Sequence, residues 1–104
     1  MLQNQIELLE ASLENPPSAA GDALAADLAG RLRATATDAP RAERALATRG
    51  LIALSHHDYR VNRLDQTNDV LAVAQTLMQD LEPETRVAVL LRRSQFELLV
   101  WDVG

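Results

Sequence analysis

The stretch from Asp38 to Tyr59 combines a helix start with a long face of small and apolar side chains. Asp38 can accept a hydrogen bond at a helix N-terminus, and Pro40 suits the first turn, where a backbone N–H is not needed. The small and apolar positions recur every three or four residues at Ala42, Ala45, Leu46, Ile52, Ala53 and Leu54. Gly50 weakens a helix slightly, but it lets a second helix approach closely. The sequence therefore predicts a central helix against which other helices pack.

Three further segments show helical spacing. Residues 1–15 place apolar side chains at intervals of four, three and four, the seam of a coiled coil, and the prolines at 16 and 17 end this pattern. Residues 18–35 begin at Ser18, a favourable helix cap, and residues 70–81 carry one broad apolar face. We expect a helix in each segment, and an extended connector at residues 60–64.

The last segment, residues 85–103, fits two structures. Its apolar side chains keep helical spacing, but they also alternate on both sides of residues 93–95, as in a β-hairpin. Neither glycine nor asparagine occurs at that turn, and Leu, Arg, Gln and Glu favour helix. The sequence favours a helix here, with the hairpin as the alternative.

Composition supports the same fold class. The 104 residues include 17 alanines and 18 leucines, the residues with the highest helix propensity, and they are enough for one core. We therefore predict a single all-α domain spanning residues 1–104, built as a bundle of four or five short antiparallel helices. The alternative is an α+β domain that ends in the hairpin.

Charge is distributed in three blocks. Residues 1–30 carry five acids and no base, residues 31–63 carry seven arginines and three acids, and residues 64–104 carry seven acids and three arginines. Blocks of opposite sign can pair within a fold or across a dimer. The central block could instead contact phosphates, and this candidate anion-binding band consists of Arg41, Arg44, Arg49, Arg60 and Arg63. The acidic flanks would repel nucleic acid. They could instead mimic nucleic acid and so occupy the binding site of a nucleic-acid-binding protein.

Several kinds of chemistry are disfavoured. The chain has no cysteine and only four scattered glycines, so thiolate catalysis, zinc–sulfur sites and phosphate-binding loops are not expected. His56 and His57 are neighbours, and adjacent side chains on a helix point about 100° apart, so they are poorly placed to share a metal. No apolar run approaches the length of a membrane span, and no export signal begins the chain. We expect a cytoplasmic protein without metal, cofactor or membrane contact; a small helical enzyme that uses either histidine is the weakest alternative.

The expected function is non-catalytic protein binding, as an adaptor, chaperone, inhibitor or antitoxin-like partner. Apolar residues are concentrated near both ends of the chain. They could complete the small core, or they could form contact surfaces that the domain does not bury by itself. The partner would be another protein or a second copy of the chain. A regulator that acts on nucleic acid, or on a nucleic-acid-binding protein, is the alternative. The predicted interaction residues are Leu2, Ile6, Leu9, Leu13, Phe96 and Trp101.

Overall fold

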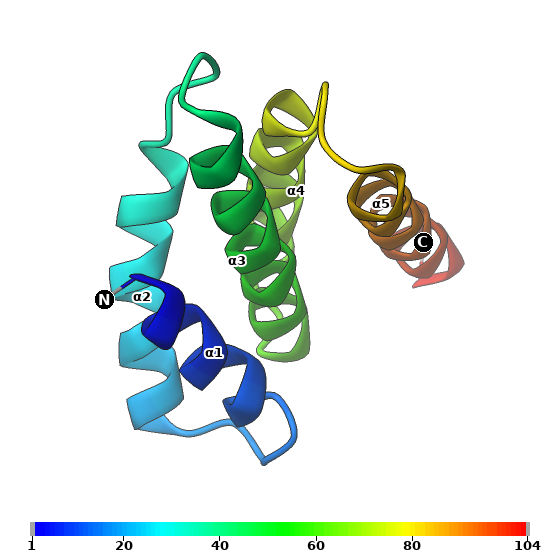
Figure 1. Ribbon diagram of the computed structural model, residues 1–104. Helices are drawn as coiled ribbons and strands as arrows, with labels where there is room; N and C mark the ends of the chain where they lie inside the picture. Colours follow the sequence, from blue (N-terminus) through cyan, green and yellow to red (C-terminus); the bar gives the residue numbers. More distant parts are fainter. Residues whose placement is uncertain (1, 104) are drawn as a thin grey trace.

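The computed structural model describes the backbone of residues 2–103 and the side chains of residues 2–98. Within this range the chain forms five helices and no strand: α1 (Leu2–Ser12), α2 (Ala19–Arg33), α3 (Arg41–Arg60), α4 (Leu64–Leu77) and α5 (Pro83–Val103) (Figure 1). The prediction of an all-α bundle is confirmed. The alternative hairpin at residues 85–103 is wrong, because α5 runs through both of its expected strands and the turn between them.

Helix α3 is the centre of the bundle, as its sequence predicts. It packs against each of the other four helices, and α4 lies beside it over most of its length (Figure 1). Its inward side chains Ala47, Leu51 and Leu54 are at most 1% exposed. Apolar side chains from every other helix meet them in one core, which includes Ile6, Leu9, Leu28, Leu32, Val70, Leu77 and Val89.

Gly50 lies on α3 in close contact with side chains of α1 and α2. A Cβ atom at this position would lie 2.6 Å from Leu32 Cδ1 and 3.0 Å from Ile6 Cγ1 and Cδ1. Both neighbouring side chains are fully buried and have little room to move. The absence of a side chain at residue 50 therefore allows the two helices to pack there.

The link between α3 and α4 is a tight turn, so the expected extended connector at residues 60–64 is wrong. Asn62 adopts a left-handed conformation with φ of 65°. The Arg63 N–H donates to the carbonyl of Asp58 at 2.7 Å, the long hydrogen bond of a Schellman-type helix end. Asparagine tolerates the left-handed region better than most residues. This turn reverses the chain and lets Arg63 reach α2.

Candidate functional site

The predicted N-terminal interaction stripe lies mostly inside the domain. Ile6 and Leu9 are fully buried in the core, while Leu2 and Leu13 are half-buried against it. Ile6 and Leu9 are therefore not available to a partner in this fold. The exposed leucine of α1 is Leu8, with 60% of its surface accessible.

Phe96, predicted to contact a partner, instead faces the domain. Its ring meets that of Tyr59 edge to face, with a centroid distance of 6.2 Å and an interplanar angle of 84°. It is half-buried and shares this side of α5 with the fully buried Val89. The side chain of Trp101, the second predicted aromatic contact, lies outside the described side chains.

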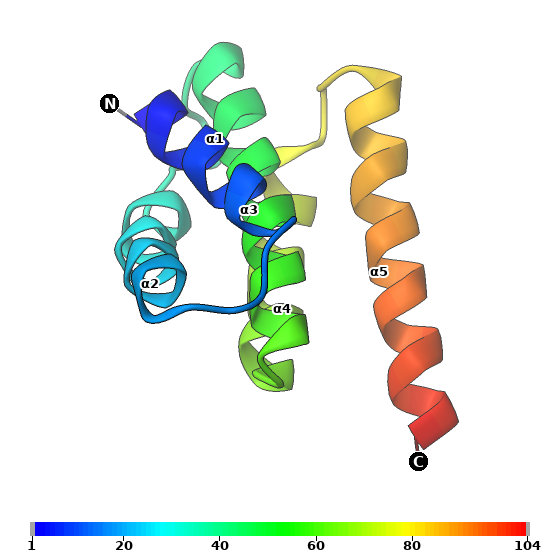
Figure 2. The same ribbon diagram turned by 90° about the horizontal axis from the view of Figure 1, so that it is seen from below.

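The opposite side of α5 carries an exposed apolar stripe, which we call the outer face. Its members are Val87, Leu90, Leu91 and Leu98, with exposed fractions of 61%, 46%, 56% and 68%. At 100° per residue these four side chains fall within about 100° of one another around the helix, and Val89 falls on the other side. Figure 2 shows that α5 stands at one edge of the molecule, with one side turned away from the other helices.

A hollow of about 250 Å³ adjoins the outer face near the start of α5. Met78, Pro83, Val87 and Leu90 provide most of its apolar lining. A single leucine or methionine side chain from another helix is of a size to enter such a hollow. The N-terminal half of the outer face thus combines projecting side chains with a depression beside them.

Two arginines of the predicted anion-binding band hold the loop between α4 and α5. Arg41 Nη2 lies 3.2 Å from Glu82 Oε1. Arg44 contacts both carboxylate oxygens of Asp80, and its Nη2–Oδ2 distance is 3.1 Å. The hydrogen bonds from Arg44 lower the pKa of Asp80. Both guanidinium groups therefore pair with the C-terminal acidic block.

Two more arginines of this band bind α1. Arg49 makes a two-point contact with Glu10, at 2.9 and 2.6 Å. Arg60 donates to three backbone carbonyls at the end of α1, those of Ser12, Leu13 and Asn15, at 2.6–3.1 Å. A cation is favourable there, because the last carbonyls of a helix carry partial negative charge and lack partners within the helix.

Arg63, the fifth arginine of the band, belongs to a three-residue cluster with Asp22 and His57. Its Nη1 and Nη2 lie 2.5 and 2.8 Å from the two oxygens of Asp22. His57 is fully buried, and its Nε2–H donates to Asp22 Oδ1 at 3.1 Å. The hydrogen bonds from Arg63, and then that from His57, lower the pKa of Asp22 below its ordinary value of 3.8. All five arginines of the band thus have partners within the chain.

The two histidines do not form a joint site. His57 points into the interior towards Asp22, whereas His56 is exposed. Among the described residues, no group of three His, Asp or Glu side chains is placed to hold a metal ion. None of the helices in the described part of the chain is both long and apolar enough to cross a membrane.

Comparisons with protein-family models, curated proteins and solved structures found no match to this chain. The predicted interaction residues include Phe96 and Trp101, because aromatic side chains are common interface anchors, but they include none of the outer-face residues. A signal was present: Val87, Leu91 and Leu98 repeat at intervals of four and seven, on a side of the helix distinct from Val89 and Phe96.

Proposed function

We propose that the chain is a non-catalytic protein-interaction module that binds through the outer face of α5, and that its partner there is a second copy of the chain. The observation that carries this proposal is the outer face itself. Four large apolar side chains on one side of a helix are each 46–68% exposed. Scattered exposed leucines are ordinary, but a contiguous stripe on a helix is typical of a contact surface.

The stripe is self-complementary when two α5 helices run antiparallel. Val87, Leu91, Ser94 and Leu98 follow intervals of four, three and four, which is a coiled-coil seam. An antiparallel pairing centred between residues 92 and 93 sets Val87 opposite Leu98 of the second copy. Leu98 of the second copy then reaches the hollow beside Val87 and Leu90. One surface thus supplies both the projecting side chain and the depression, as a two-fold symmetric interface requires.

Charge favours the antiparallel direction. Arg86 and Glu97 lie on the same edge of the outer face, about 20° apart around the helix and about 16 Å apart along it. In the antiparallel pairing each Arg86 comes within about 3 Å, measured along the axis, of the level of Glu97 in the second copy. In a parallel pairing, Arg86 of one copy and Glu97 of the other remain about 16 Å apart along the helix axis. Arg86 forms no ion pair with any side chain that the structure describes, whereas Glu97 contacts Arg93 at 3.3 Å and retains a second oxygen.

Light scattering coupled to gel filtration tests the proposal. We expect the measured mass to rise with concentration from 11.4 kDa towards about twice that value. Leu91→Asp places a charge in the middle of the seam and should keep the chain monomeric. Leu8→Asp is the matched control, because Leu8 is a similarly exposed leucine on α1.

A mass of 11.4 kDa at every concentration would contradict a second copy as the partner. Equal loss of the dimer in Leu8→Asp and Leu91→Asp would contradict the outer face as the interface. Circular dichroism of both variants checks that each remains helical.

A further inference from the structure

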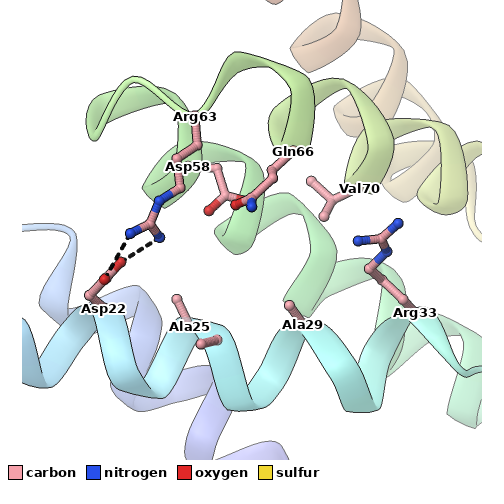
Figure 3. A pocket seen from close by; sticks show the side chains of 9 residues that line it. Asp22, Ala25, Ala29, Arg33, Asp58, Arg63, Gln66 and Val70 are labelled. Carbon is pink, nitrogen blue, oxygen red and sulfur yellow. Dashed lines mark hydrogen bonds and ion pairs between the residues drawn. The ribbon is translucent and has the colours of Figure 1, made fainter.

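A cleft of about 440 Å³ lies between α2 and α4, with α3 as its floor (Figure 3). Ala25, Ala26 and Ala29 form the α2 side, and their short side chains leave the space open. Gln66 and Val70 on α4 face these alanines across the gap (Figure 3). The volume is within the range of sites that hold small organic molecules. No residue of α5 lines the cleft, so it is separate from the outer face.

Asp58 lies at the floor of the cleft, and among the described residues its side chain makes no ion pair; the charges of His57, Arg63 and Arg33 act on it only from a distance. The residue is only 5% exposed, and its carboxylate points towards the open space beside Gln66 (Figure 3). Its carboxylate accepts no hydrogen bond from any side chain or backbone group that the structure describes. A buried carboxylate without partners is costly, and burial raises the pKa of Asp58.

The two arginines of the cleft are paired with other acids. Arg63 is held by both oxygens of Asp22, and Arg33 lies 3.8 Å from Asp69. The cleft therefore contains two arginines whose nearest acids are Asp22 and Asp69, and one carboxylate, Asp58, that none of the described cations contacts directly. This balance favours a ligand with positive charge over an anion. A bare metal ion is disfavoured, because no group of three His, Asp or Glu side chains among the described residues is placed to hold one.

We infer that the cleft between α2 and α4 is a binding site for a small organic ammonium compound, whose cationic group is held by Asp58. An ammonium group has three donors, which suit the two carboxylate oxygens of Asp58 and the carboxamide oxygen of Gln66. A short alkyl body fits between Ala25 and Ala29 on one side and Val70 on the other. Ligand binding here would act independently of self-association through α5.

Butylammonium chloride is the probe for this inference. In a titration followed by ¹H–¹⁵N NMR of the full chain, we expect saturable shifts at the amides of residues 25–29, 58 and 66–70. Two matched titrations exclude simpler causes: 1-butanol has a similar alkyl body without the charge, and sodium chloride supplies the ionic strength. Saturation by butylammonium alone supports the site, and equal shifts from 1-butanol overturn it.

Two substitutions locate the interaction. Asp58→Asn keeps the shape of the side chain but removes its charge, and we expect affinity for butylammonium to fall about tenfold or more. Asp38→Asn is the control for net charge, because Asp38 is an exposed acid outside the cleft, and its affinity should stay unchanged. Ala29→Leu fills the space while keeping Asp58, and it should also abolish the saturable shifts.

Each outcome decides the inference. Loss of binding in Asp58→Asn and Ala29→Leu, but not in Asp38→Asn, supports it. Unchanged affinity in Asp58→Asn, or saturable binding that persists in Ala29→Leu, overturns it. The wild-type spectrum without probe, compared with that of each variant, shows whether the fold is kept. A wild-type chain that shows no saturable shift up to high millimolar butylammonium also overturns the inference.

Discussion

Arg63 and Asp22, which are 41 residues apart in the chain, form a two-point ion pair with N–O distances of 2.5 and 2.8 Å. The pair joins the start of α4 to the start of α2 beside the buried ring of His57. It therefore links one rim of the cleft to the interior of the bundle.

Arg63→Gln should lower the melting temperature by a few degrees at neutral pH. The hydrogen bonds from Arg63 are the main cause of the lowered pKa of Asp22. A carboxyl group whose pKa is lower in the folded state stabilises the fold above its ordinary pKa of 3.8, and this stabilisation is lost as the pH falls. Thermal unfolding between pH 7 and pH 3 should show the difference between wild type and variant shrinking below about pH 4.

Arg33→Gln is the comparison for this prediction. Its pair with Asp69 has a distance of 3.8 Å and side chains that are 47% and 56% exposed. Such pairs contribute little, so a smaller effect is expected. A difference for Arg63→Gln that grows at low pH would contradict the assigned role of Asp22.

Asp58→Asn should raise stability at neutral pH, by about 1 kcal/mol, because it removes a buried charge whose desolvation outweighs the attraction of the nearby cations. Burial raises the pKa of Asp58 in the folded state, so the ionised group destabilises the fold as the pH rises above 3.8. The gain in the variant should therefore be present at pH 7 and vanish at acid pH. Urea unfolding at several pH values measures it, and a loss of stability at pH 7 would show that the carboxylate has a structural partner.

Gly50→Ala should destabilise the fold by about 1–3 kcal/mol, although alanine is the better helix former. The added Cβ would lie 2.6 Å from Leu32 Cδ1, where the core is fully packed. Gly30→Ala is the matched control, because a Cβ there meets nothing within 4 Å. It should stabilise the fold by about 0.5–1 kcal/mol. Equal changes in the two variants, measured by urea unfolding, would be inconsistent with close packing at Gly50.

Asn62→Gly should leave stability unchanged or raise it by up to about 1 kcal/mol, and Asn62→Ala should lower it by about 1 kcal/mol. The residue has a φ of 65°, which glycine adopts without strain and alanine does not. The melting temperatures of the two variants test this order. The reverse order would argue against a left-handed turn between α3 and α4.

The proposed antiparallel pairing predicts a charge-exchange result. Arg86→Glu and Glu97→Arg should each weaken self-association about fivefold or more, because each change affects two symmetric contacts. The double variant should recover much of the loss, since the two charges again have opposite sign. Sedimentation equilibrium measures the dissociation constants. Additive weakening in the double variant would exclude this register.

The sequence by itself was sufficient to predict that the chain is helical and where its main helices lie. Apolar spacing and helix-favouring composition are local properties, and they predicted the central helix, the helices around it and the all-α class. Close helix packing at Gly50 was also predictable, because a glycine within a helical pattern commonly marks a position where a second helix approaches closely. The turn at Asn62 was missed because the residues around it carry no glycine or proline, although asparagine is a known signal for the left-handed conformation.

Only the tertiary structure decided which apolar faces are covered. Ile6 and Leu9 lie on a stripe as regular as that of Val87, Leu91 and Leu98. Ile6 and Leu9 are nevertheless buried, whereas the three residues of α5 are exposed. Periodicity specifies which residues share a face, but burial depends on which helix packs there. Asp58 and Asp22 likewise look alike in sequence, and only the fold places Arg63 in direct contact with Asp22 and not with Asp58. Such differences arise because a side chain's environment is set by residues distant in the sequence, which local patterns do not specify.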